Sequence, residues 1–168
     1  MLYKVFNFQI IWCPFKFLNL ILGIVYHAED HFLYNPYLPS HSRVFVPNPS
    51  MHKLPYENVQ VCTTDGVLLN MFFIHQPEDR QRLCPTVVFF HGNAGNMGHR
   101  LQNCFGLYHN LHCNILMVEY RGYGFSEGQP SEEGLYIDAK TSIDYLYTRN
   151  DINHSEIIVF GRSLGNLC

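Results

Sequence analysis

The stretch Ile157-Ile158-Val159-Phe160-Gly161-Arg162-Ser163-Leu164-Gly165 decides how the rest of the chain is interpreted. Its first four residues form an apolar run typical of a buried strand, and its last five have the pattern Gly-x-Ser-x-Gly. In this pattern a strand turns sharply into a helix, and the small flanking residues let the backbone crowd together so that the serine hydroxyl projects from the turn. The pattern predicts a nucleophile at Ser163, the alternative being an ordinary glycine-rich turn.

Length and composition favour one globular domain. The chain has 168 residues, of which 47% are hydrophobic and 15% charged, so it can bury one ordinary core. The net charge is −3 and no long Lys/Arg run occurs, so we expect no nucleic-acid partner. The cysteines form no Cys-x-x-Cys pair and the histidines lack the paired spacing of metal ligands. We therefore expect no metal and no cofactor.

Residues 1–26 are apolar and aromatic and are long enough to span a bilayer. Lys16 opposes insertion by about 3 kcal/mol, whereas each Leu, Ile, Phe or Val favours it by about 0.3 to 0.6 kcal/mol. Lys4 precedes the run and Glu29 and Asp30 follow it, which favours a cytoplasmic amino terminus. The segment is predicted to anchor a single-pass type II membrane protein. A cleaved signal peptide and a soluble amphiphilic or buried segment remain as alternatives.

Repeated prolines indicate that residues 27–56 form an extended connection to a domain expected over residues 57–168. The domain opens with an alternating run at 58–63, followed by an Asp-Gly turn and an apolar run at 67–74. Two strand-like runs joined by an Asp-Gly turn are typical of an antiparallel β-hairpin.

Strands and helices then alternate along the chain. Uninterrupted apolar runs at 86–90, 114–119 and 156–160 predict strands, and helical spacing of apolar residues predicts a helix at 101–111. Ser131 can cap a further helix, because two acidic residues follow it in the first turn. This alternation requires right-handed crossovers and a parallel sheet behind the hairpin, so the predicted fold class is α/β.

Acyl transfer needs a nucleophile, a base and hydrogen-bond donors for the developing negative charge on the carbonyl oxygen. With Ser163 as nucleophile, the backbone N–H of Leu164 would be one donor. The loop after the strand at 86–90 would supply the second donor, from the N–H of Asn93 or Ala94. The same loop could instead cradle a phosphate or be a plain tight turn. Ala94 replaces the second glycine of Gly-x-Gly-x-x-Gly, however, and the sequence has no Gly-Lys-Ser/Thr motif.

Four motifs in order carry a resemblance to a known family. They are Phe89-Phe90-His91-Gly92-Asn93-Ala94-Gly95-Asn96-Met97-Gly98-His99-Arg100, Glu119-Tyr120-Arg121-Gly122-Tyr123-Gly124, Ser131-Glu132-Glu133-Gly134-Leu135-Tyr136 and the pentapeptide at 161–165. Together they resemble the Bem46-like branch of the α/β-hydrolases over residues 31–165. The resemblance implies a membrane-anchored serine hydrolase with a Ser-Asp-His triad and a small acyl or lipid-like substrate. It implies Ser163 as nucleophile and the loop from Asn93 as oxyanion hole, and it leads us to expect aspartate where Glu119 stands.

The sequence departs from this family at its end. In this fold the triad residues follow the order serine, acid, histidine, but the residues after Ser163 include neither an acid nor a histidine. We therefore expect the N-terminal half of an α/β-hydrolase fold, ending just after the nucleophile elbow and inactive by itself. The strand at 156–160 would then be an apolar edge that aggregates or pairs with a partner. The alternatives are a non-catalytic, membrane-anchored interaction protein and a gene-model fragment without independent function.

Overall fold

The structure, a computed structural model, describes residues 17–25, 29–30 and 33–166. The chain divides into two compact units, Met1–Leu33 and Tyr34–Cys168. In the first unit residues 17–25 are helical, and most of their side chains are exposed. Within the described part of the chain no helix is both long enough and apolar enough to cross a bilayer. The remaining residues of the predicted anchor at 1–26 lie outside the described residues.

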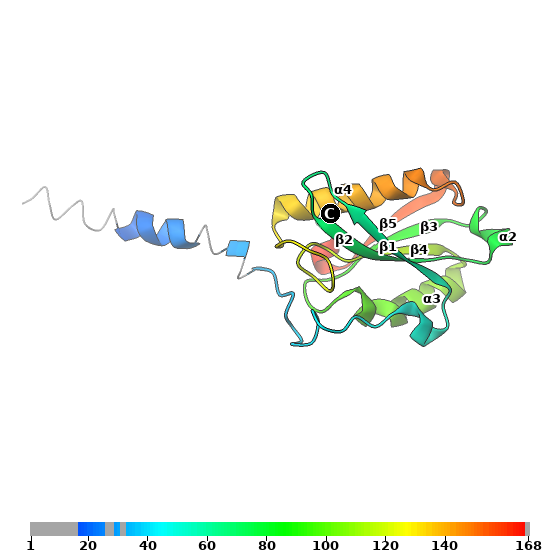
Figure 1. Ribbon diagram of the computed structural model, residues 1–168, viewed down its shortest axis with the longest axis horizontal. Coiled ribbons are helices and arrows are strands. Elements are labelled where there is room, and N and C mark those ends of the chain that lie inside the picture. The colour runs from blue at the N-terminus through cyan, green and yellow to red at the C-terminus, as the bar shows by residue number, and fades with distance from the viewer. Residues whose placement is uncertain (1–16, 26–28, 31–32, 167–168) are drawn as a thin grey trace, which may run out of the picture. The chain divides into compact units, whose positions relative to one another are not determined.

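The second unit is built on a five-stranded mixed sheet with the strand order β1-β2-β4-β3-β5 (Figure 1). The strands are β1 (Tyr56–Cys62), β2 (Leu68–Ile74), β3 (Thr86–Phe90), β4 (Asn114–Val118) and β5 (Ile157–Gly161). β2 pairs antiparallel with β1 and with β4, whereas β3 pairs parallel with β4 and with β5. The prediction of an antiparallel hairpin leading into a parallel sheet is confirmed.

Helices lie on both faces of this sheet, α4 on one and α3 on the other (Figure 1). The α-helices are α2 (Glu78–Gln81), α3 (Leu101–Leu111) and α4 (Glu132–Thr148), and the 3₁₀ turns are η1 (Pro49–His52), η2 (Met97–Arg100), η3 (His154–Glu156) and η4 (Ser163–Asn166). The helix predicted at 101–111 is present, and the Ser131 hydroxyl caps α4 by accepting the N–H of Gly134 at 3.2 Å.

Side chains of β3 alternate between the two helical layers. Val88 and Phe90 belong to the core under α4, and Val87 and Phe89 belong to the core over α3. Since every residue of β3 and β4 is buried, their apolar runs show no alternation in sequence.

β5 has the same apolar character but lies at the edge of the sheet, where it pairs with β3. Ile158, Val159 and Phe160 are 50%, 51% and 43% exposed. An exposed apolar edge strand can pair with a strand of another chain, and most proteins avoid exposing one.

Residues 34–48 form a strap that is part of the second unit. The strap is not extended throughout as the sequence predicts, because residues 36–44 form successive turns and bends, closed by hydrogen bonds such as that from the N–H of Ser42 to the carbonyl oxygen of Pro39 at 2.9 Å. Its side chains Tyr34 and Val46 are buried, one in each core cluster. The strap also bonds to the loop after β3, since the Asn96 side-chain amide donates to the carbonyl oxygens of Ser42 and Phe45, both at 2.9 Å. The connection expected at 27–56 is therefore packed against the domain from Tyr34 onward.

Candidate functional site

Ser163 stands at the turn between β5 and η4, with its side chain exposed. Its φ is +54°, in the left-handed region that a residue with a Cβ enters at a cost of about 1 to 2 kcal/mol. Strained backbone of this kind persists where the surrounding structure enforces it, commonly at active sites. The sharp strand-to-helix turn predicted by the pentapeptide is therefore present, and its helical part is a 3₁₀ turn.

Two glycines make this turn sterically feasible. A Cβ at Gly161 would overlap the carbonyl oxygen of Gly165, and a Cβ at Gly165 would overlap the carbonyl oxygen of Phe90. The turn is also tied to the end of β3, because the N–H of Arg162 donates to the Phe90 carbonyl oxygen at 3.1 Å. The two glycines of the pentapeptide are thus required by close backbone contacts rather than by flexibility.

The loop after β3, residues 91–97, lies beside this turn because β3 and β5 are parallel neighbours whose carboxyl ends meet. We call these residues the oxyanion loop. A Cβ at Gly92 would lie 3.6 Å from the Cβ of Ser163 and 3.5 Å from the carbonyl oxygen of Arg162. Leu164, the residue after the serine, is buried. The elbow and the loop that carries Asn93 and Ala94 therefore come together, and the donor roles of these N–H groups stay a prediction.

Asn93 is held from two sides. Its side-chain Oδ1 accepts a hydrogen bond from the Tyr123 hydroxyl at 2.7 Å and another from the backbone N–H of Asn35 at 3.1 Å. Burial raises the pKa of the Tyr123 hydroxyl, which keeps it protonated as a donor. The strap and the loop after β4 thus both fix the position of Asn93.

Ala94 is held by a cation. The Arg100 Nη2 donates to the Ala94 carbonyl oxygen at 2.8 Å. Burial lowers the pKa of Arg100, and the positive charge of Arg162 lowers it further. The Arg100 guanidinium therefore fixes the backbone of the oxyanion loop at Ala94.

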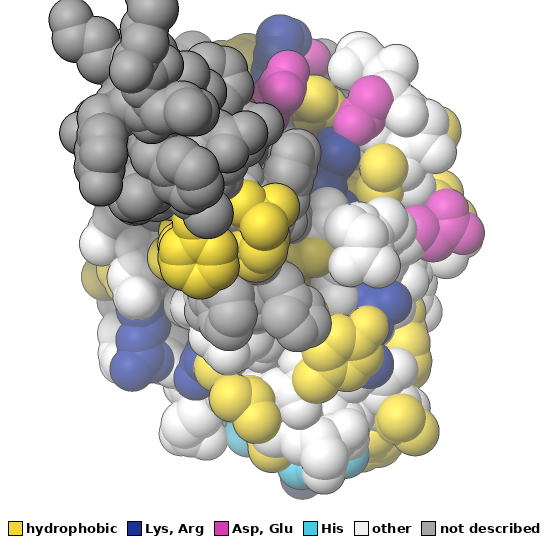
Figure 2. Space-filling model, turned by 90° about the vertical axis from the view of Figure 1, so that its left-hand side faces the viewer, with side chains coloured by type: hydrophobic (Ala, Val, Ile, Leu, Met, Phe, Trp, Pro, Cys, Tyr) yellow, Lys and Arg dark blue, Asp and Glu magenta, His cyan; other side chains and the backbone are white. Residues whose placement is uncertain are grey.

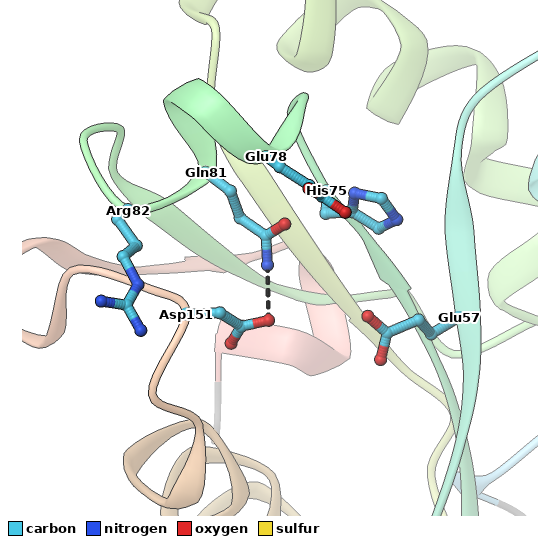
Figure 3. Close-up of a pocket in the computed structure, with 6 residues that line it drawn as sticks. All are labelled: Glu57, His75, Glu78, Gln81, Arg82 and Asp151. Carbon is cyan, nitrogen blue, oxygen red and sulfur yellow. Dashed lines mark hydrogen bonds between the residues drawn. The ribbon is translucent and has the colours of Figure 1, made fainter.

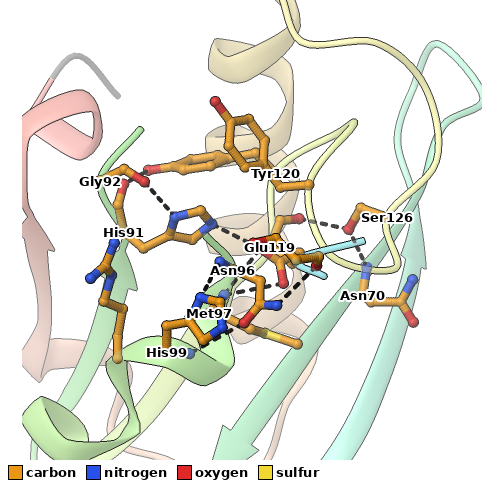
Figure 4. A network of polar contacts seen from close by, with 12 residues as sticks. Asn70, His91, Gly92, Asn96, Met97, His99, Glu119, Tyr120 and Ser126 are labelled. Carbon is orange, nitrogen blue, oxygen red and sulfur yellow. Dashed lines mark hydrogen bonds and ion pairs between the residues drawn. The ribbon is translucent and has the colours of Figure 1, made fainter. Parts of the chain in front are cut away.

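A buried ion pair underlies the oxyanion loop (Figure 4). His91 Nε2 lies 2.9 Å from Oε1 of Glu119, and both side chains are fully buried. The other ring nitrogen, Nδ1, lies 2.7 Å from the carbonyl oxygen of Gly92. Both ring nitrogens of His91 therefore already have an oxygen partner, and neither of these partners is Ser163. Sequence reasoning gave Glu119 no role, although a carboxylate at the end of an apolar strand is costly to bury without partners.

A hollow of about 410 Å³ lies at the end of the sheet opposite the elbow (Figure 3). It is lined by charged and polar side chains, namely Glu57, His75, Glu78, Gln81, Arg82 and Asp151. Arg149 pairs with Glu57 at 2.8 Å and also with Asp151, so these acids are largely neutralised. Within the described residues no group of His, Cys, Asp and Glu is arranged to hold a metal ion. In parallel sheets ligands bind at the carboxyl ends of strands, which favours the elbow as the site.

Apolar side chains border the oxyanion loop. The strap carries the exposed residues Tyr37, Leu38, Val44 and Phe45, and the loop after β4 carries Phe125. The strap contacts the loop directly, since the carbonyl oxygen of Leu38 accepts the N–H of Gly95 at 2.6 Å. Figure 2 shows hydrophobic side chains at the surface among Lys, Arg and uncharged polar ones.

Three relatives have sequences similar to this chain. The alpha/beta hydrolase domain-containing protein WAV2 of Arabidopsis thaliana is 44% identical over 82% of this chain and 44% of its own length. The protein bem46 of Schizosaccharomyces pombe is 38% identical over 87% of this chain and 48% of its own. The uncharacterized membrane protein YNL320W of Saccharomyces cerevisiae is 32% identical over 88% and 50%. The chain thus spans about half the length of these relatives.

Solved structures give the same picture of the fold. The Pyrococcus furiosus esterase Pf2001 superposes with a TM-score of 0.58 at 25% identity, over 73% of this chain and 48% of that one. No protein-family model matches the chain.

Backbone strain at Ser163 predicts an unusual order of stability for two substitutions at this position. We expect Ser163→Gly to be more stable than Ser163→Ala by about 1 kcal/mol, because glycine adopts a positive φ without a Cβ clash. At Ser142, inside α4, the ranking should reverse, since glycine is about 1 kcal/mol worse than alanine in a helix. Urea unfolding of the four variants measures both differences. If alanine were more stable than glycine at both positions, the strained backbone at Ser163 would be contradicted.

Proposed function

Because the chain belongs to the Bem46-like branch of the α/β-hydrolases, we propose that it carries the nucleophile and the oxyanion loop of a serine hydrolase. The substrate class is an acyl ester or thioester, with a small acyl or lipid-like group. One observation carries the proposal: Ser163 is exposed at a positive φ beside the loop that opens with Gly92.

The reaction would begin with attack of the Ser163 oxygen on the substrate carbonyl carbon. The serine proton passes to a histidine base, which in this fold follows the nucleophile in the chain. The N–H of Leu164 and that of Asn93 or Ala94 stabilise the carbonyl oxygen as it becomes negative, by about 2.7 to 4 kcal/mol for each donor. The alcohol or thiol then leaves with a proton, and water hydrolyses the acyl-serine.

Residues 1–168 by themselves should be inactive in this reaction. His91 is fully engaged with Glu119 and Gly92, so it supplies no base. Residues 164–168 contain no histidine and no acid. A serine without a base is a weak nucleophile.

Membrane attachment is a further part of the proposal. Residues 1–26 would anchor the protein as a single-pass type II chain with a cytoplasmic amino terminus. Support comes from the apolar sequence of this segment, from the exposed apolar side chains at 17–25, and from the relative YNL320W, which is named a membrane protein.

An interaction role is favoured by one specific observation, the exposed edge at β5. Val159 points to the α4 side of the sheet with its partner Val88, and Phe160 stacks on Phe89 at 5.1 Å on the α3 side. Apolar side chains therefore stand on both faces of an edge strand. We propose that this strand, β5, which the sequence predicts at 156–160, pairs with another chain or drives aggregation.

Chemical labelling tests the proposed nucleophile. The whole protein, isolated from cells that make it, should react with a fluorophosphonate probe at Ser163, located by mass spectrometry of the labelled peptide. Ser163→Ala should abolish the label, and Ser155→Ala, at an exposed serine, should leave it unchanged. Residues 1–168 produced alone should give no Ser163-dependent label, because no base is at hand. A whole protein that stays unlabelled at Ser163 would refute the proposed function.

Extraction from membranes tests the anchor. We expect the chain to stay in the pellet after alkaline carbonate treatment. Replacing Leu20 and Ile24 together by lysine should release it, since each change disfavours insertion by about 3 kcal/mol. The control is Val44→Lys, at an exposed position of the second unit. Release of the unsubstituted chain by carbonate would contradict the anchor.

A charge on the edge strand tests self-association or partner pairing through β5. Val159→Lys should raise the concentration at which the chain begins to associate by roughly tenfold, because lysine on an edge opposes strand addition. Leu83→Lys makes the same change at a residue that is 78% exposed and outside the sheet, and it should have no effect. Static light scattering measures the onset. An equal effect of both substitutions would argue against β5.

A further inference from the structure

Glu119 joins the two ends of the oxyanion loop. At the start of the loop His91 Nε2 lies 2.9 Å from Oε1 of Glu119. At its end the backbone N–H of Met97 donates to both carboxylate oxygens, each at 3.1 Å. A single buried carboxylate therefore closes residues 91–97 into a ring of hydrogen bonds (Figure 4).

The backbone of Glu119 is itself fixed to the sheet. Its carbonyl oxygen accepts a hydrogen bond from the Ser126 hydroxyl at 2.8 Å. That hydroxyl in turn accepts a hydrogen bond at 2.9 Å from the backbone N–H of Asn70 in β2. Gly124 leaves the space that the carboxylate occupies, since a Cβ there would overlap the Glu119 side chain. The oxyanion loop is thus connected through Glu119 to the central strands.

Glu119 holds the oxyanion loop through its hydrogen bonds to His91 and Met97. What the loop would lose without Glu119 is an acceptor for the Met97 N–H and a partner for His91, both in a fully buried place. Buried groups left unpaired are costly, so the loop would open to reach water.

We propose that Glu119 is a positioning residue: its hydrogen bonds to His91 and Met97 hold the oxyanion loop in the conformation that faces Ser163. The effect of this positioning on catalysis rests on the proposed hydrolase function. Its structural part, a loop closed by one buried side chain, is measurable without any activity.

Amide hydrogen exchange of the full chain tests the structural part. In Glu119→Ala, exchange in the peptide covering residues 91–100 should speed up by about 30-fold or more, because two buried partners lose their hydrogen bonds. In Glu119→Gln it should stay within about threefold of the unsubstituted chain, since the amide can accept from Met97 and donate to His91 Nε2. This rescue separates hydrogen bonding from charge.

The matched control is Asn114→Ala, at the opposite end of β4. Asn114 is also fully buried and makes several hydrogen bonds, one of them to the N–H of Gln76 at 2.9 Å. Its removal should destabilise the sheet but leave residues 91–100 no faster than the rest of the chain. The proposal is overturned if Glu119→Ala leaves the loop within threefold of the unsubstituted chain, if it speeds up the loop no more than Asn114→Ala, or if Glu119→Gln opens it as far as alanine.

A second pair of variants applies if Glu119→Ala does not fold. Met97→Pro removes the donor N–H at the first position of η2, where proline is tolerated, and Asn96 before it has the extended backbone that proline requires. Met97→Ala shortens the same side chain and keeps the N–H. Exchange at residues 91–96 should be about tenfold faster in the proline variant than in the alanine variant. Equal exchange in the two would overturn the proposal.

An activity measurement on the whole protein completes the test. Glu119→Ala should slow fluorophosphonate labelling of Ser163 by about 30-fold or more per folded molecule, and Glu119→Gln should restore most of the rate. Labelling that is unaffected while the loop opens would overturn the positioning role. Absence of Ser163 labelling in the unsubstituted whole protein would refute the hydrolase function, whereas the exchange result would still report on the loop.

Discussion

The close approach of Gly165 to the end of β3 is the constraint on which the site depends. Because only a hydrogen fits between this residue and the Phe90 carbonyl oxygen, the chain after β5 must turn back over β3. That turn forces Ser163 to a positive φ and exposes its side chain. It also sets Ser163 against Gly92, where the oxyanion loop begins. Close backbone packing therefore sets the proposed nucleophile beside the loop of candidate donors, and side-chain hydrogen bonds hold that loop in place.

Buried carboxylates fix both loops that surround the elbow. Glu119 holds the loop after β3, and Asp138 on α4 holds the loop after β4 by accepting the backbone N–H of Arg121 at 2.8 Å and its Nε at 2.9 Å. Burial raises the pKa of Asp138, although the hydrogen bonds from Arg121 oppose the shift. Removing one member of a buried ion pair such as Asp138 and Arg121 typically costs about 3 to 5 kcal/mol, because the remaining charge is left buried. These loops are thus held by a few polar side chains inside an apolar core.

Local patterns in the sequence predicted most of the fold. The strand at 86–90 and the helix at 101–111 have the expected bounds, because covered strands and amphipathic helices leave direct traces in apolar spacing. The last strand begins one residue later than expected, since Glu156 ends the 3₁₀ turn η3. The strap at 34–48 was read as a connection because its contacts with the oxyanion loop join residues more than fifty positions apart, as between Ser42 and Asn96. Glu119 was missed for the same reason, since its partners are distant in sequence.

In the proposed hydrolase, Ser163 and the oxyanion loop act together on a single carbonyl oxygen. A crystal structure of the whole protein carrying a phosphonate on Ser163 measures this arrangement directly. We expect the phosphoryl oxygen to lie about 2.7 to 3.1 Å from the backbone nitrogen of Leu164 and from that of Asn93 or Ala94. A phosphonate on Ser163 whose oxygen points away from the loop, or a phosphonate bound to another residue, would contradict the account.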